Sequence, residues 1–189
     1  RCSLKQRAVI FEGAVLGDGV TVGQDAVLHP GVKLWPEKSV ETGATVRDSV
    51  IWGSQASKTL FGRYGVTGLT NVDITPEFAA KLGAAFAGSL PVGATVTINR
   101  DEDRSSRMIK RGIIGGLPSA GINVADLRTM PIPVARYITR ISDASGGVHV
   151  RVAPYDRSVI DIRFVDERGL NLSKDMERSI ERVFFREDF

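Results

Sequence analysis

The chain has 189 residues, of which 42% are hydrophobic and 25% charged, as in a typical folded protein. This composition excludes a disordered chain, and no apolar run approaches the roughly 18 residues that a transmembrane helix needs. The net charge of +3 is too small to indicate nucleic-acid binding. The one cysteine, Cys2, excludes an internal disulfide framework and indicates a reducing compartment. We therefore expect a cytoplasmic protein with neither a nucleic-acid nor a membrane partner.

Large aliphatic residues recur every six positions through the first fifty residues, at Ile10, Leu16, Val22, Leu28, Leu34, Val40 and Val46. A second row of small or apolar residues lies four positions after each of these, broken only at Lys38. Between the rows lie mostly glycine or aspartate, which tolerate a positive φ at a turn. A period of six fits neither an α-helix nor an alternating strand, and predicts a hexapeptide β-helix over residues 1–52. The alternative is a glycine-rich β-sandwich with accidental spacing.

The second half follows a different pattern, in which strand-like and helix-like segments alternate. Residues 53–59 are small and polar and predict a linker. Helices are predicted from Thr75-Pro76 to Gly88, over 104–117, over 133–141 and after Ser173, and strands over 94–99, 122–127, 148–152 and 159–165. This alternation predicts an α/β domain over residues 60–189, with parallel pairing and with the last two strands as a hairpin.

Two loops lie where ligands of open α/β sheets bind, beyond the carboxyl ends of strands. The first loop contains Arg100, Ser105 and Ser106, which are candidates to bind a phosphate through guanidinium, hydroxyl and free N–H groups. The second loop follows a fourth candidate, Arg151, and ends at Ser158. The alternative for the first loop is a charged connection with a helix cap. The sequence identifies no catalytic residue and no set of metal ligands in these loops.

Four segments carry a resemblance to known families. Residues 10–51 resemble the left-handed β-helix that is appended to sugar-nucleotide pyrophosphorylases. Three further segments resemble domain I of the α-D-phosphohexomutases, namely LFGRYGVTG at 60–68, INRDEDRSS at 98–106 and GGVHVRVAPYDRSVIDIRFVD at 146–166. The resemblance implies a mixed fold, in which a left-handed hexapeptide β-helix precedes an α/β domain of the phosphohexomutase domain I type. It also implies part of a mannose-1-phosphate guanylyltransferase fused to a phosphomannomutase-like region.

This resemblance implies several properties of a longer protein. Because the chain begins at Arg1, we expect a fragment, with a nucleotidyltransferase domain before Arg1 and the mutase metal loop after Phe189. The longer protein is expected to use Mg²⁺ and to bind a sugar phosphate or a nucleotide sugar, whereas the fragment itself is expected to hold no cofactor and no metal. The β-helix is expected to join subunits into a homo-oligomer.

The same resemblance contains departures from the mutase pattern at four positions. The family carries its phosphate on the serine of a T-A-S-H-N-P loop, and a gap-free alignment places Ala153 at that serine and Pro154 at the histidine. Alanine has no oxygen with which to hold a phosphoryl group. Two arginines of the family are replaced by Thr67 and Asp103, and Asp103 would repel phosphate.

These departures favour a non-catalytic role for the second half, as a degenerate module for oligomerisation or regulation in a sugar-nucleotide enzyme. Two alternatives stay open. One is an active bifunctional phosphomannomutase and guanylyltransferase in which Ser158 replaces the missing nucleophile. The other is a hexapeptide-repeat acyltransferase with His29 as its general base.

Overall fold

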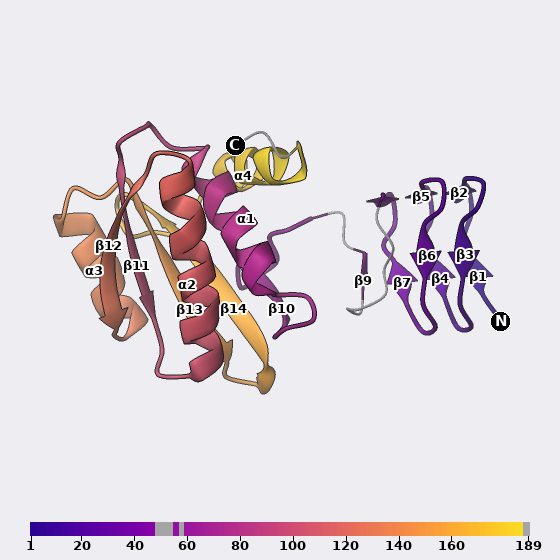
Figure 1. Ribbon diagram of the computed structural model, residues 1–189, viewed down its shortest axis with the longest axis horizontal. Coiled ribbons are helices and arrows are strands. Elements are labelled where there is room, and N and C mark those ends of the chain that lie inside the picture. The colour runs from indigo at the N-terminus through magenta and orange to yellow at the C-terminus, as the bar shows by residue number, and fades with distance from the viewer. Residues whose placement is uncertain (48–54, 57–58, 187–189) are drawn as a thin grey trace. The chain divides into compact units, whose positions relative to one another are not determined.

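Figure 1 shows the computed structural model of the chain, which describes residues 1–47, 55–56 and 59–186. The chain divides into two compact units, Arg1–Leu60 and Phe61–Phe189. Most of the predicted linker, at residues 53–54 and 57–58, lies outside the described residues.

The first unit consists of very short parallel strands. They are β1 (Ser3–Leu4), β2 (Val9–Ile10), β3 (Val15–Leu16), β4 (Thr21–Val22), β5 (Val27–Leu28), β6 (Lys33–Leu34), β7 (Ser39–Val40), β8 (Thr45–Val46) and β9 (Gln55–Ala56). From β1 to β5 each strand pairs with the strand three later, so that Val9 lies opposite Val27 and Val27 opposite Thr45. The resulting sheets have the orders β1-β4-β7-β9, β2-β5-β8 and β3-β6.

The spacing of the sequence explains these strands. From β2 to β8 the second residue of each strand belongs to the aliphatic row, and Val22, Leu28 and Leu34 are almost completely buried. The chain turns between strands at residues with positive φ, among them Gly13, Gly19, Asp25, Gly31, Glu37 and Gly43. The six-residue row and its turn positions are therefore confirmed as far as Val46, whereas Ser49 lies outside the described residues.

The fold class predicted for the chain is nevertheless wrong in naming a left-handed hexapeptide β-helix. A six-residue spacing fixes where inward side chains and turns fall, but it does not fix the hand in which a chain coils. The described residues of the first unit give short parallel strands in three sheets, and the one large sheet with helices belongs to the second unit. The fold class is therefore α/β with parallel sheets, rather than a mixed fold that begins with a left-handed β-helix.

The second unit is built on a five-stranded sheet with the order β10-β14-β13-β11-β12 (Figure 1). Its elements are β10 (Val66–Leu69), α1 (Pro76–Ala87), β11 (Thr95–Arg100), α2 (Arg104–Ser119), β12 (Asn123–Thr129), α3 (Ile132–Ile141), β13 (Gly146–Ala153), β14 (Asp156–Asp166) and α4 (Lys174–Arg186). β12, β11 and β13 are parallel, whereas β14 runs antiparallel to both β13 and β10.

The helices and strands predicted for the second half are confirmed. The first helix begins at its predicted cap, because the Thr75 hydroxyl accepts a hydrogen bond from the Phe78 N–H at 3.2 Å. The last two strands form the predicted hairpin. The sequence pattern does not predict β10, because its four residues include Gly68 and carry little strand signal.

The two faces of this sheet differ in polarity. One face is apolar and packs against α1 and α2, and it includes Val96, Ile98, Val148, Val150, Ile160 and Ile162. Because Gly116 has no Cβ, α2 can approach α1 closely; a Cβ at this position would collide with the Ala80 carbonyl of α1. The other face is partly covered by α3 and carries the buried polar side chains of Thr97, Asn99 and His149. The buried polar side chains Thr97, Asn99 and His149 therefore lie on one side of the sheet.

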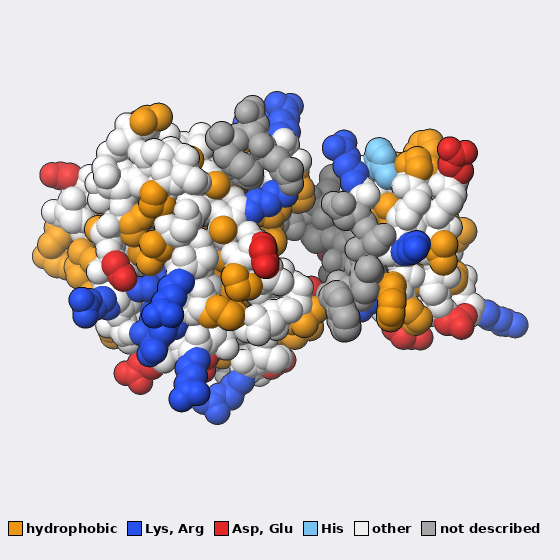
Figure 2. All heavy atoms as spheres, in the orientation of Figure 1, with side chains coloured by type: hydrophobic (Ala, Val, Ile, Leu, Met, Phe, Trp, Pro, Cys, Tyr) orange, Lys and Arg blue, Asp and Glu red, His pale blue; other side chains and the backbone are white. Residues whose placement is uncertain are grey.

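The solvent side of α2 is basic. Arg104, Arg107 and Arg111 are exposed along it, and Figure 2 shows Lys and Arg side chains gathered over this helix. The opposite side of α2 buries Ile109 and Ile113, so the charges form the solvated face of an amphipathic helix. Among the residues that the structure describes, no helix is both long and apolar enough to cross a membrane.

Candidate functional site

The two loops identified in the sequence lie side by side at the carboxyl ends of β11 and β13. Asp101 joins them, because its Oδ2 accepts a hydrogen bond from the Val152 N–H at 2.7 Å. Its Oδ1 accepts a second bond, from the Asp103 N–H at 3.0 Å. The parallel register places Arg100 opposite Val150, so both loops leave the sheet at the same edge. The structure therefore brings the two candidate regions together.

The first loop is closed around the start of its own helix. Asp103 caps α2, because its Oδ1 accepts a hydrogen bond from the Ser105 N–H at 2.8 Å. The Arg100 guanidinium donates to the carbonyl of Asp101 in the same loop. Ser106 is completely buried, and its Oγ finds no hydrogen-bond partner within the described part of the chain. The cap carboxylate occupies the helix N-terminus, so phosphate binding by Arg100, Ser105 and Ser106 stays a prediction.

The second loop is a tight hairpin turn. β13 and β14 pair as far as Ala153 and Asp156, which leaves only Pro154 and Tyr155 at the turn. Ala153, the residue that the gap-free alignment places at the serine of the mutase family, is 2% exposed. Ser158 lies further along β14 at the surface, where its hydroxyl donates to Asp156 Oδ1 at 2.7 Å.

The hydrogen bonds between Ser158 and Asp156 weaken the carboxylate as a base. Hydrogen bonds from the Ser158 hydroxyl and N–H lower the pKa of the Asp156 carboxyl. A carboxylate with a lowered pKa takes up a proton less readily, and therefore activates a hydroxyl less well.

Arg151 is bound by a carboxylate inside the sheet. Its Nε and Nη2 donate to Asp161 Oδ2 at 3.2 and 3.1 Å. The Thr67 hydroxyl donates to the other oxygen, Asp161 Oδ1, at 3.0 Å. The Asp161 side chain is 0% exposed and that of Arg151 25% exposed. Arg151 is thus engaged by an internal anion, and its contact with phosphate also stays a prediction.

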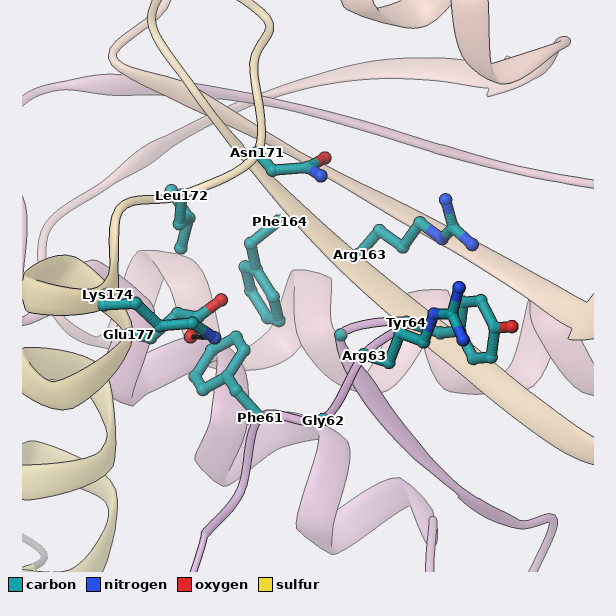
Figure 3. Close-up of a pocket in the computed structure, with 11 residues that line it drawn as sticks. Phe61, Gly62, Arg63, Tyr64, Arg163, Phe164, Asn171, Leu172, Lys174 and Glu177 are labelled. Carbon is teal, nitrogen blue, oxygen red and sulfur yellow. Dashed lines mark hydrogen bonds and ion pairs between the residues drawn. The ribbon is translucent and has the colours of Figure 1, made fainter.

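A pocket of about 230 Å³ lies between the segment before β10, the strand β14 and the start of α4 (Figure 3). It is lined by Phe61, Gly62, Arg63, Tyr64, Gly65, Arg163, Phe164, Asn171, Leu172, Lys174 and Glu177. Figure 3 shows the Arg63, Tyr64 and Arg163 side chains together on one side, and those of Lys174 and Glu177 on the other.

The basic side of this pocket is formed by two arginines near one tyrosine ring. The guanidinium carbons of Arg63 and Arg163 each lie 5.7 Å from the centroid of the Tyr64 ring. The Arg163 Nε is buried and finds no hydrogen-bond partner in the described residues. Burial, and then the charge of Arg151, lower the pKa of the Arg163 guanidinium. An anion bound here would therefore offset a positive charge that is only partly compensated.

The other side of the pocket carries no excess charge. Lys174 Nζ pairs with Glu177 Oε2 at 2.5 Å. Phe61 packs edge-on against Phe164, with ring centroids 5.6 Å apart, and gives the pocket an apolar wall. Sequence reasoning missed this site, although the segments 60–68 and 146–166 contain both arginines. Their approach depends on the pairing of β10 with β14, for which the sequence pattern gives no signal.

The remaining candidates are His29 and the acidic residues that could hold a metal. The His29 ring is partly buried and lies 6.0 Å from the ring of Phe11. Within residues 1–47, 55–56 and 59–186, no three His, Cys, Asp or Glu side chains lie together as metal ligands. Both the absence of a metal from this chain and the use of Mg²⁺ by a longer protein stay predictions.

Comparison with known proteins identifies the second unit. Residues 58–189 match the family model described as phosphoglucomutase/phosphomannomutase, alpha/beta/alpha domain I. The chain is 36% identical over 134 residues to a phosphoglucomutase/phosphomannomutase of Thermococcus kodakarensis, which covers 69% of this chain and 29% of that protein. It is 32% identical over 129 residues to a probable phosphoglucosamine mutase of Pyrococcus abyssi, covering 68% and 28%. The chain spans less than a third of the length of these relatives.

Solved structures share this fold. A putative phosphomannomutase from Thermus thermophilus matches with a TM-score of 0.62 and 21% identity, over 68% of this chain and 30% of that one. A phosphoglucomutase/phosphomannomutase family protein from Burkholderia thailandensis matches with a TM-score of 0.61 and 20% identity, over 70% and 31%. At such identities the likeness shows the fold alone.

These findings correct part of the predicted identity. The matches are to sugar-phosphate mutases, and they support neither a guanylyltransferase fusion nor a left-handed β-helix with hexapeptide repeats. The classification as a nucleotidyltransferase is therefore wrong, whereas the phosphohexomutase resemblance is confirmed. The chain belongs to the phosphoglucomutase/phosphomannomutase family, and residues 58–189 form its α/β/α domain I.

Proposed function

We propose that this chain is the hexose-phosphate-binding first domain of a phosphohexomutase-type protein, and that the phosphate group binds between Arg63 and Arg163. The relatives are named as mutases of phosphorylated sugars. The observation that carries the proposal is the pair of guanidinium groups at 5.7 Å from the Tyr64 ring, on one side of a pocket. Guanidinium groups bind phosphate oxygens in a bidentate manner, and two of them match the charge of a phosphate monoester.

The size and lining of the pocket suit a small phosphorylated sugar. Its volume of about 230 Å³ lies below the roughly 300–1,000 Å³ that is usual for drug-sized ligands. The apolar wall formed by Phe61 and Phe164 would contact the C–H face of a sugar ring. The basic side would hold the phosphate, so the two ends of the ligand would meet different chemistry.

The hairpin of β13 and β14 supports a role in binding a phosphosugar without forming a covalent phosphoryl intermediate. Ala153 stands at the aligned position of the phosphate-carrying serine, and the turn that follows it has only Pro154 and Tyr155. The backbone of this strand end is also fixed, because Asp101 accepts the Val152 N–H. In this proposal the domain binds the phosphosugar but does not itself hold a phosphoryl group covalently.

Calorimetric titration of the whole chain with glucose 6-phosphate, and with glucose as the uncharged comparison, tests the proposal. We expect glucose 6-phosphate to bind and glucose to bind at least about tenfold more weakly. Arg163→Met should remove most of this difference. The matched control is Arg168→Met, because Arg168 pairs with Asp166 outside the pocket. Equal binding of both sugars, or unchanged binding in Arg163→Met, contradicts the proposal.

A second candidate is a phosphoryl carrier at Ser158, and the hydrogen bond from its hydroxyl to Asp156 at 2.7 Å is the observation in its favour. The lowered pKa of Asp156 argues against it. Incubation of the chain with a hexose 1,6-bisphosphate, followed by mass spectrometry, separates the two candidates. We expect no phosphoserine, and a stable phosphate on Ser158 would establish the second candidate instead.

A further inference from the structure

The sheet of the second unit contains an anion that belongs to the protein itself. We propose that Asp161 is an internal counter-anion, which occupies the anion-binding position between Arg151 and Thr67 and keeps phosphate from binding there. Asp161 is thus a specificity-determining residue, because it leaves the Arg63 and Arg163 pocket as the place for a ligand anion. This last step rests on the proposed function, whereas the exclusion of phosphate at Arg151 does not.

The three side chains form one row across three neighbouring strands. Thr67 of β10 lies directly opposite Asp161 of β14, and Arg151 of β13 lies directly opposite the same Asp161 on the other side. Side chains at directly opposed positions point to the same face of a sheet. The row is therefore fixed by the register of the strands and not by a mobile loop.

The contacts within this row are those of a bound anion. Two nitrogens of Arg151 donate to one carboxylate oxygen of Asp161, at 3.2 and 3.1 Å, and the Thr67 hydroxyl donates to the other at 3.0 Å. A guanidinium and a hydroxyl are also the groups that hold a phosphate. Because the Asp161 side chain is 0% exposed, its charge would be costly without these donors.

The resemblance to the mutase family indicates that the positive charge in this row has moved from one strand to another. By the motif resemblance the family has an arginine at the position of Thr67, and in the gap-free alignment the threonine that begins its T-A-S-H-N-P loop falls on Arg151. In this chain the guanidinium therefore lies on β13, two strands away from the family's position, and a carboxylate lies between them on β14. The positive charge is retained in the sheet, but Asp161 neutralises it.

The surroundings explain why this one carboxylate matters. His149 and Arg163 lie on the same face, directly opposite each other on β13 and β14. The pKa of His149 is lowered to about 4 by burial and then by the charge of Arg151, so His149 is neutral near pH 7. Without the charge of Asp161, Arg151 would be a largely buried cation next to Arg163, and this face would attract anions.

The test is the binding of inorganic phosphate to the whole chain with Asp161→Ala, which removes the carboxylate and vacates its position between Arg151 and Thr67. We expect phosphate to bind about tenfold more tightly than to the unmodified chain at the same ionic strength. The gain should disappear in the double variant Asp161→Ala with Arg151→Met. The matched control is Asp166→Ala, on the same strand and with the same change in net charge, which should show no gain.

Several outcomes would overturn the proposal. A folded Asp161→Ala variant without tighter phosphate binding does so, and so does a gain that persists in the double variant. Should Asp161→Ala unfold, as circular dichroism would reveal, the variant Arg151→Gln tests the proposal instead. Its affinity for phosphate should match that of the unmodified chain, because the charge it removes is already neutralised, and a tenfold loss would contradict the proposal. The proposed function is tested by a different measurement, namely the binding of glucose 6-phosphate to the unmodified chain and to Arg163→Met, so the two failures can be told apart.

Discussion

The two units of this chain use strands in different ways. In the first unit each strand is two residues long, and Val9 finds its partner in Val27, the same position of a later repeat. In the second unit β14 is 11 residues long and pairs along both of its edges. The first arrangement repeats one contact between residues 18 positions apart, whereas the second joins residues at many different separations and of different kinds.

This difference decides where a site can form. A two-residue strand has one inward and one outward side chain, so the first unit offers the same environment at each repeat. A long central strand instead places several polar side chains on one face between two neighbours. Thr67, Asp161 and Arg151 meet for this reason, and so do the two arginines beside Tyr64.

The largest effect should follow from removing a large inward side chain of the first unit. Leu28 is completely buried in the cluster of aliphatic residues. Leu28→Ala should lower the free energy of unfolding of this unit by about 4 kcal/mol, because a cavity is left in a tightly packed row. Both tryptophans, Trp35 and Trp52, belong to the first unit, so tryptophan fluorescence in a urea titration measures the change.

The neighbouring outward residue provides the control. Val27 lies in the same two-residue strand and is only partly buried, so Val27→Ala should cost less than about 1 kcal/mol. Equal losses for Leu28→Ala and Val27→Ala would show that the inward row does not carry the stability of this unit. A loss of helical circular dichroism at the same urea concentration would show that the units unfold together, since every described helix lies in the second unit.

The next largest effect is a loss of stability of the second unit at low pH, which we expect from the buried His149. Burial, and then the charge of Arg151, lower the pKa of His149 to about 4, below its ordinary value of 6.5. The unfolded chain therefore binds this proton at a higher pH than the folded one. Stability from this group is complete above pH 6.5 and is lost as the pH falls towards 4. The loss should reach about 3 kcal/mol at pH 4, and urea titrations followed by circular dichroism from pH 7.5 to 4 measure it.

Each unit has one of the two histidines, which supplies a matched pair of variants. His149→Gln should remove most of the pH dependence, because glutamine does not titrate. His29→Gln, in the first unit, should leave the pH dependence of the second unit in place. If His149→Gln and the unmodified chain lose stability in parallel between pH 6.5 and 4, the buried histidine is not the cause.

A smaller effect concerns the contact between α1 and α2. Alanine substitutions at the adjacent residues Gly115 and Gly116 of α2 should change the free energy of unfolding in opposite directions. A Cβ on Gly116 would meet the Ala80 carbonyl, whereas nothing lies within 4 Å of a Cβ on Gly115. Gly116→Ala should cost about 2 kcal/mol through overpacking. Gly115→Ala should stabilise by about 0.5–1 kcal/mol, because alanine is the better helix former. Thermal unfolding followed by circular dichroism compares the two, and a stabilising Gly116→Ala would contradict the close approach of the helices.

The elements of the second unit could be predicted because their signals are local. Thr75 and Pro76 mark the start of α1, and the apolar row of Ile109, Ile113 and Leu117 gives the buried side of α2. In the first unit the spacing gave the strand positions and the turns. The fold class of this unit could not follow from it, because a side-chain period indicates where strands and turns fall but not how the strands assemble.

The candidate site could be predicted only in part. The sequence placed the two sheet-edge loops correctly, and the structure joins them through Asp101. It could not show that Arg151 is neutralised, since Asp161 reaches it only by the register of β13 with β14. The pocket beside Tyr64 was missed for a similar reason. Arg63 and Arg163 are a hundred residues apart, and only the unpredicted pairing of β10 brings them together.

The smallest effect concerns the residue whose charge is most at odds with phosphate binding. Asp103 caps α2 through the Ser105 N–H at 2.8 Å, so its carboxylate has a structural role at the helix N-terminus. Asp103→Ala should cost about 1 kcal/mol, measured by urea titration with circular dichroism, whereas Asp103→Asn should cost less because asparagine is also a good cap. Thr75→Ala, which removes the cap of α1, is the matched comparison and should cost a similar amount. If Asp103→Ala leaves the free energy of unfolding unchanged while Thr75→Ala lowers it, the Asp103 carboxylate does not stabilise α2. The structural role proposed for this carboxylate would then be wrong.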